Sequence, residues 1–265
     1  MRRTLAVVMA HPDDECYPTY GTVARHADDP TFRLVVLHVT DGEGGEIADG
    51  VPVARERLGA WRREEDTNAW RALGRVPDRH VWLGLPDGGL EQVGVEPIRD
   101  AVVGFFREER PDVVVTMALD GVTGHPDHIV VARATTEAFH VVRAEGGAGL
   151  QRLLYGAVPQ SGFEKTQRWR EDRGKPVWDP TTTYHLRGTP DDQIGAVSDN
   201  RHVVHRVLAA IKEHGSQRHV LYDSDVPDED WTWILQREQW IIAWPPREPG
   251  QPLLQGMFAG LDESW

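Results

Sequence analysis

Short apolar runs alternate with longer amphipathic segments along the first 158 residues of the chain. The apolar runs have the length and β-branched content of strands and lie at residues 4–9, 33–39, 80–83, 112–117 and 153–158. The segments between them carry apolar residues at helical spacing, which predicts helices over 17–27, 53–73, 97–107 and 128–142. Strands that alternate with helices form parallel sheets covered on both faces. We therefore expect an α/β fold with a doubly wound, mostly parallel, Rossmann-like sheet.

The pattern weakens after residue 158. Residues 160–193 are rich in charge, Pro, Thr and Trp and lack periodicity, which is typical of a functional loop or lid. Their aromatic residues, among them Trp169 and Tyr184, favour a packed loop over disorder. A helix over 201–214 and a strand over 238–244 follow. We expect one domain over 1–265, with an α/β core at 1–158 and a loop-rich cap or substrate region at 159–265.

Charge and cysteine content limit the binding partners and the cellular compartment that we expect. A net charge of −13, from 42 acidic and 29 basic residues, argues against a nucleic-acid partner and an anionic membrane surface. There is no apolar run of about 18 residues that could span a membrane, and the N-terminal run predicts a strand and not a signal peptide. The lone Cys16 fits a reducing cytoplasm. We expect Cys16 to be a small packed hydrophobe, with a reactive or metal-binding role as the alternative.

Two polar clusters follow two of the predicted strands. Ala10-His11-Pro12-Asp13-Asp14-Glu15 comes after the first, and His125-Pro126-Asp127-His128 comes after the run that ends at Met117. Carboxyl ends of strands in open α/β sheets carry the chemistry of such folds, so we expect a single site. His11, Asp14 and His128 would give three ligands and an open position, as in catalytic zinc sites. Such a site brings the pKa of its bound water to about 7 and polarises a carbonyl.

The remaining polar residues of the clusters suggest acid–base roles. Asp13 would take the proton of the metal-bound water, and His125 would stabilise the oxyanion or protonate the leaving amine. Asp127 would fix a histidine tautomer. Together these parts predict metal-assisted hydrolysis of an amide. The structural alternative for Asp13 and Asp14 is helix capping. The pairs His202/His205 and His214/His219 are expected on solvated faces.

The two clusters resemble AHPDDE and HPDH, the signature motifs of the LmbE-like or PIG-L family of zinc-dependent deacetylases. Further similarities lie in the Gly-rich segment 40–45, the loop 83–88, the segment 214–217, and a helix with Arg62, Glu65, Ala69, Leu73 and Gly74. The resemblance implies removal of an N-acetyl group from N-acetylglucosamine-type sugars, alone or in antibiotics and other secondary metabolites. Neighbouring members are amidases that cleave mycothiol conjugates.

By this resemblance His11, Asp14 and His128 would bind Zn²⁺, with Fe²⁺ as an alternative. Asp13 would be the general base, and His125 would act as acid or oxyanion stabiliser, supported by Asp127. Arg62 or Arg63, together with Asp87, would touch the sugar. Some family members carry a tyrosine two residues before the first histidine of the second motif, where this chain has Thr123. That oxyanion role cannot be carried over.

Two alternatives to an amino-sugar deacetylase remain at this point. A thiol-conjugate amidase would use the same chemistry on a bulkier acyl group, for which the Trp-bearing segment 160–193 could make room. A non-catalytic sugar- or nucleotide-binding module is disfavoured, because no G-x-G-x-x-G follows the first strand. The sequence leaves the oligomeric state open, a homo-oligomer included.

Overall fold

The computed structural model describes residues 3–222, 225–248 and 250–261. Its strands are β1 (Arg3–Met9), β2 (Phe32–Thr40), β3 (Arg79–Leu85), β4 (Val113–Met117), β5 (Arg152–Gly156), β6 (Ala196–Asp199), β7 (Arg237–Trp244) and β8 (Leu254–Gln255). Its helices are α1 (Cys16–Arg25), α2 (Leu58–Leu73), α3 (Leu90–Val93), α4 (Val95–Glu109), α5 (Gly121–Gly124), α6 (Pro126–Ala144), α7 (Gln160–Glu171), α8 (Val204–Glu213), α9 (Arg218–Leu221) and α10 (Asp228–Leu235). Short 3-10 turns cover Arg55–Arg57, Asp191–Gln193 and Gly215–Gln217.

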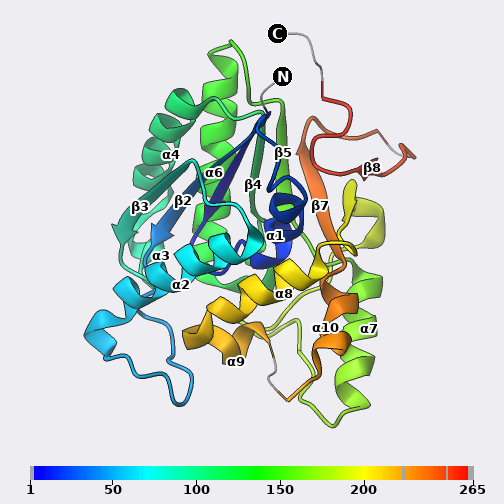
Figure 1. The fold of residues 1–265 in the computed structure, drawn as a ribbon. Helices are drawn as coiled ribbons and strands as arrows, with labels where there is room; N and C mark the ends of the chain where they lie inside the picture. The colour runs from blue at the N-terminus through cyan, green and yellow to red at the C-terminus, as the bar shows by residue number, and fades with distance from the viewer. Residues whose placement is uncertain (1–2, 223–224, 249, 262–265) are drawn as a thin grey trace.

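All of these strands belong to one sheet, in the order β3-β2-β1-β4-β5-β7-β6-β8 (Figure 1). The five strands from β3 to β5 in that order are parallel, whereas β7 is antiparallel to both of its neighbours. Chain order reverses between β1 and β4, and such a switch point opens a crevice beyond the carboxyl ends of the strands. The expected doubly wound, mostly parallel sheet is confirmed.

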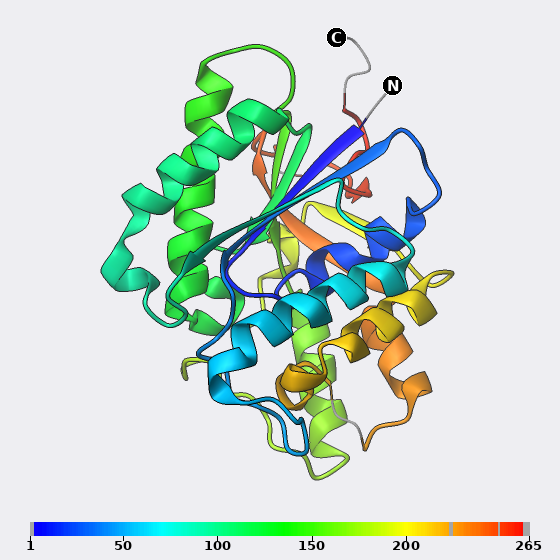
Figure 2. The same cartoon turned by 60° about the vertical axis from the view of Figure 1, so that its left-hand side comes forward.

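Strand β1 shows how the core is divided between the two faces. Leu5, Val7 and Met9 pack with buried residues of α1, α2 and α8 on one face. Ala6 and Val8 pack with buried residues of α4 and α6 on the other. Successive side chains of a strand point to opposite faces, so an uninterrupted apolar run serves both layers. Figure 2 shows the two helical layers on opposite sides of the sheet.

In the second half of the chain, α8 and β7 match the predicted helix and strand, but other parts depart from the prediction. Residues 160–193 do not form an irregular stretch throughout, because α7 occupies their first third; only Phe163 of this helix is buried, so its apolar periodicity is weak. Strands β6 and β8 were not predicted, and they add residues beyond 158 to the same sheet. Across the described part of the chain, every helix is too short or too polar to cross a bilayer.

Candidate active site

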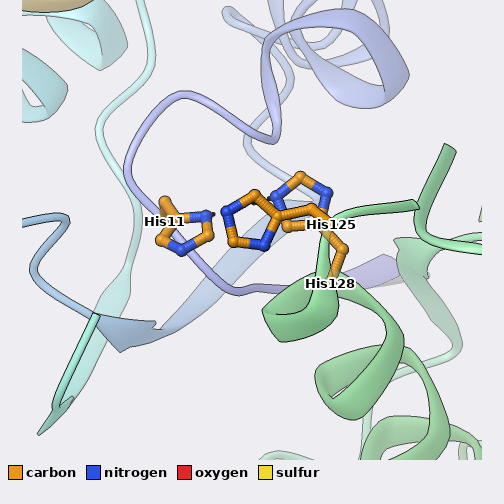
Figure 3. Close-up of side chains that lie close together, drawn as sticks. All are labelled: His11, His125 and His128. Atoms are coloured by element: carbon orange, nitrogen blue, oxygen red, sulfur yellow. Dashed lines mark hydrogen bonds between the residues drawn. The ribbon is translucent and has the colours of Figure 1, made fainter. Parts of the chain in front are cut away.

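Three histidines meet where β1 and β4 end (Figure 3). His11 follows β1, and His125 and His128 lie at the start of α6. The ring centroid of His11 lies 4.8 Å from that of His125 and 5.2 Å from that of His128. The rings of His125 and His128 are stacked at 4.5 Å. Both polar clusters of the sequence therefore form one site.

The predicted metal ligands aim their donor atoms at one another. Nδ1 of His11 lies 3.2 Å from Nε2 of His128 and 3.3 Å from a carboxylate oxygen of Asp14. The other oxygen of Asp14 lies 3.1 Å from Nε2 of His128. Burial opposes the charge on Asp14, but His128 and His11 hold its pKa well below the usual value. Two imidazole nitrogens and a carboxylate at this spacing are a donor set that suits zinc.

The opposite ring nitrogens of the two histidines are also paired. Nδ1 of His128 lies 3.1 Å from the carbonyl oxygen of Gly121, which can only accept, so Nε2 keeps its lone pair for a metal. Nε2 of His11 lies 2.9 Å from Oδ1 of Asp87 and 3.4 Å from Oδ2 of Asp127. The Asp127 carboxylate thus contacts the side chain of His11. The backbone N–H of Asp127, in turn, donates to Nδ1 of the His125 ring.

Asp13 sits beside this donor set in a strained backbone conformation. Its φ of 114° lies in a region that favours glycine. Its N–H donates to Oε2 of Glu15 at 3.1 Å, and Nη2 of Arg62 donates to its Oδ2 at 3.0 Å. Burial raises the pKa of Asp13 to about 7 against the lowering effect of Arg62. The carboxylate is therefore fixed in place and suited to accept a proton.

The chain is similar in sequence to known proteins. Residues 6–139 match the PIG-L family, described as GlcNAc-PI de-N-acetylase. A 1D-myo-inositol 2-acetamido-2-deoxy-alpha-D-glucopyranoside deacetylase of Tsukamurella paurometabola is 31% identical, over 99% of this chain and 100% of that protein. The chain belongs to the PIG-L family. The family prediction made from the two motifs is confirmed.

Solved structures agree with the PIG-L fold. The N,N'-diacetylchitobiose deacetylase from Pyrococcus horikoshii aligns with a TM-score of 0.59 at 19% identity, covering 91% of this chain and 83% of that one. The 4-carboxy-2-hydroxymuconate hydratase GalB of Pseudomonas putida aligns with a TM-score of 0.64 at 18% identity, covering 94% and 100%. At such identities the similarity shows the fold alone. Because one neighbour is named a hydratase, the fold by itself does not select the activity.

A buried polar network behind Asp13 was not predicted for this PIG-L chain. Oε1 of Glu15 accepts from the Tyr20 hydroxyl at 2.9 Å, and Oε2 lies 3.1 Å from Nε2 of His38. The Tyr20 hydroxyl also lies 2.8 Å from Nε2 of His214. The prediction of a solvated His214 is wrong: α8 ends at Glu213, the chain turns inward, and His214 is 1% exposed. The similarity of segment 214–217 to the family was the signal in the sequence that could have pointed to a role for His214.

The other three histidines of the two pairs and Cys16 behave as expected. His202, His205 and His219 are exposed. Cys16 is a buried member of the core, and burial raises the pKa of its thiol, so the thiol stays protonated at neutral pH.

The predicted sugar-contact residues have different surroundings. Arg62 is 4% exposed and donates to the carbonyl oxygens of Pro12 and Gly42 in addition to Asp13. Arg63 is more open, with 39% of its side chain exposed; it pairs with Asp41 at 2.5 Å and lies over the Trp82 ring.

Asp87 is bound on both carboxylate oxygens. Oδ1 faces His11, and Oδ2 accepts from the N–H of Gly44 at 2.9 Å. Burial opposes its charge, but His11 and other donors lower its pKa to about 2. Its carboxylate is therefore ionised at neutral pH and helps to orient the His11 ring.

Proposed function

We propose that this chain is a metal-dependent N-deacetylase that removes an acetyl group from an amino sugar or an amino-sugar-bearing natural product. The observation that carries the proposal is the convergence of the His11, Asp14 and His128 donor atoms beside the buried Asp13 carboxylate. The relative from Tsukamurella paurometabola is named as a deacetylase of a 2-acetamido-sugar, which supports the substrate class.

His11, Asp14 and His128 would hold the metal, for which we propose Zn²⁺ with Fe²⁺ as the alternative. When bound, such a cation activates a water molecule and polarises the amide carbonyl. The donor set fits because the second ring nitrogen of each histidine is already engaged by an oxygen acceptor. Asp127 supports this arrangement from behind: its carboxylate accepts the N–H groups of Gly88 and Leu90 and faces His11.

Asp13 would act as the general base. It accepts the proton that the attacking water loses, and its pKa of about 7 suits both acceptance and release of that proton near neutral pH. Arg62 holds the carboxylate in place during the transfer. The strained backbone at Asp13 is consistent with a pre-organised group, because strain of this kind gathers at active sites.

His125 would stabilise the oxyanion that develops on the amide, or act as the acid toward the leaving nitrogen. Burial, together with the neighbouring His128 and His11, lowers its pKa to about 4, so its ring is neutral at pH 7. The N–H of Asp127 donates to Nδ1 of His125, which leaves the ring proton on Nε2. The neutral ring can donate its Nε2–H as a hydrogen bond to the developing oxyanion. To act as the acid, His125 would first have to take up a proton, such as the one that Asp13 accepts from the water, and pass it to the leaving nitrogen as the C–N bond breaks.

Substrate contacts and cellular location are further parts of the proposal. Arg63 and Asp87 are proposed to touch the sugar, and Arg62 to act through Asp13 in addition to any contact of its own. We propose a cytoplasmic enzyme, on the strength of its single buried cysteine.

The test is release of acetate and free amine from methyl N-acetylglucosaminide by the zinc-loaded protein. Asp13→Ala should retain about one metal per chain but lose activity by about 10²–10⁴-fold. Undiminished turnover in this variant would contradict the role of Asp13 as the general base. Longer N-acyl chains are tested in parallel: faster cleavage of these would favour the thiol-conjugate amidase. Binding without hydrolysis of any amide would favour the non-catalytic module.

A further inference from the structure

Tyr184 places an exposed aromatic ring at the candidate active site. Its ring meets that of His125 edge-on, with centroids 5.0 Å apart and an interplanar angle of 82°. Tyr184 is 64% exposed, although most large aromatic residues in the described chain are buried or half-buried. An apolar surface of this size beside a proposed catalytic group is available to cover the apolar face of a ligand.

The backbone around Tyr184 is held in an unusual conformation. Its φ of 70° is a left-handed value that a bulky side chain rarely adopts. Its N–H donates to the carbonyl oxygen of Thr123 at 2.8 Å, and that of Arg187 donates to the carbonyl oxygen of Val122 at 2.9 Å. Two bonds therefore join this loop to the segment that immediately precedes His125. They fix the position of the ring relative to that histidine.

The far end of the same loop is also anchored. The N–H of Thr189 donates to the carbonyl oxygen of Val158 at 2.7 Å, and the N–H of Gln160 donates to the carbonyl oxygen of Thr189 at 2.6 Å.

The described residues include five non-glycine positions with positive φ, and three of them, Asp13, Val122 and Tyr184, lie in the site or in the segments that contact it. Backbone strain persists only where the surroundings hold it, and it gathers at ligand clamps.

We propose that Tyr184 is a substrate-binding residue whose ring packs against the C–H face of the pyranose, while the acyl group lies over His11, Asp14 and His128. This inference rests on the proposed deacetylase function and adds a specificity-determining residue to it. A pyranose presents C–H groups on its faces, and the electron-rich face of an aromatic ring attracts them. The contact would favour cyclic amino sugars over acyclic amides that offer the same acetyl group.

The experiment compares Tyr184→Ala and Tyr184→Phe on two substrates. Methyl N-acetylglucosaminide carries the pyranose, and N-acetylethanolamine carries the same amide without a ring. Tyr184→Ala should raise KM for the sugar about three- to tenfold, the range expected for one aromatic contact, and leave the acyclic amide unchanged. Tyr184→Phe should resemble the wild type on both. Val76→Ala is the control, because Val76 is 51% exposed and lies before β3, at the opposite end of the parallel strands.

Calorimetric titration with the sugar separates this inference from the proposed function. If the wild type binds the sugar without releasing acetate, the proposed function fails, while weaker binding by Tyr184→Ala still supports the aromatic contact. An unchanged KM and affinity in Tyr184→Ala overturns the inference. So does an equal loss on both amides, or a loss in Tyr184→Phe as large as in Tyr184→Ala. A sugar that is neither bound nor hydrolysed by the wild type overturns both.

Discussion

Arg62 and Asp13 form a buried ion pair, in which Nη2 of Arg62 lies 3.0 Å from Oδ2 of Asp13. Only 5% of the Arg62 side chain and 10% of the Asp13 side chain are exposed. The same guanidinium donates to the carbonyl oxygens of Pro12 and Gly42, so it joins α2 to the turn that follows β1. The position of the proposed base therefore depends on a residue of another element.

Arg62→Met should reduce both stability and activity. Removal of one partner from a buried pair leaves the other charge unpaired, at a cost of about 3 kcal/mol in the free energy of unfolding. Arg63→Met is the matched control, because this half-exposed arginine pairs with Asp41 and should cost about 1 kcal/mol or less. Urea unfolding and acetate release measure the two effects. Equal losses in both variants would argue against a special role for Arg62.

Gly42→Ala should displace the Arg62 guanidinium. Gly42 has a φ of 68°, and a Cβ there would lie 2.3 Å from Nη1 of Arg62. Gly146→Ala provides a control for backbone strain, since Gly146 has a φ of 77° and no atom within 4 Å of its added Cβ. We expect both variants to lose some stability and only Gly42→Ala to lose about tenfold or more in kcat. Full activity in Gly42→Ala would mean that the Arg62 contact is dispensable.

Zinc should stabilise the fold through the histidine–carboxylate donor set. At 100 times its dissociation constant the metal adds about 2.7 kcal/mol, or roughly 5–10 °C in Tm for a chain of this size. The rise should disappear in His128→Ala and persist in His202→Ala, which removes an exposed histidine. Calorimetry with and without a chelator measures it. The ligand assignment fails if His128→Ala shows the same rise as the wild type.

Glu238 should make stability depend on pH. Its carboxylate accepts the N–H groups of Gly21 and Thr22, at 2.6 Å and 2.9 Å, and the Thr22 hydroxyl at 2.5 Å. Burial raises its pKa from 4.5 to about 7 in spite of these donors. The folded state thus favours the protonated form, whose full contribution is present below pH 4.5. This contribution is lost as pH rises from 4.5 to about 7, by at most about 1.4 kcal/mol per pH unit.

Glu238→Gln cannot ionise and should flatten that slope, even if it lowers stability overall. Glu213→Gln, at an exposed position near the end of α8, is the control and should leave the slope unchanged. Unfolding free energies from urea titrations between pH 4.5 and 8 provide the comparison. Parallel curves for wild type and Glu238→Gln would show that Glu238 is not the group responsible.

The sequence predicted the centre of the site better than its surroundings. Apolar runs of strand length precede both motifs, and a parallel sheet places the carboxyl ends of its strands at one edge. The convergence of His11, Asp14 and His128 could therefore be predicted from the sequence around each motif. His214 and Tyr184 could not be placed in this way. His214 reaches the site through its contact with Tyr20, and Tyr184 through its hydrogen bond to Thr123. Both contacts join distant parts of the chain, so the local pattern of apolar and polar residues does not predict them.

The strands that close the sheet were only partly predictable, for a related reason. Strand β6 is four residues long and pairs with β7, about 40 positions away, so its apolar pattern is too brief to stand out. Helix α7 buries a single residue and therefore shows little amphipathic period. Long buried elements are visible in sequence, whereas short or exposed ones depend on tertiary contacts.

The most direct test of the central claim is the stoichiometry of products formed from methyl N-acetylglucosaminide. We expect the zinc-loaded protein to release acetate and free amine in equal amounts. Asp13→Asn, of nearly the same shape, should bind zinc as the wild type does and release almost none of either product. Equal product formation by the wild type and Asp13→Asn would contradict the account. So would a wild type that releases neither a carboxylic acid nor a free amine from methyl N-acetylglucosaminide and from its analogues with longer N-acyl chains.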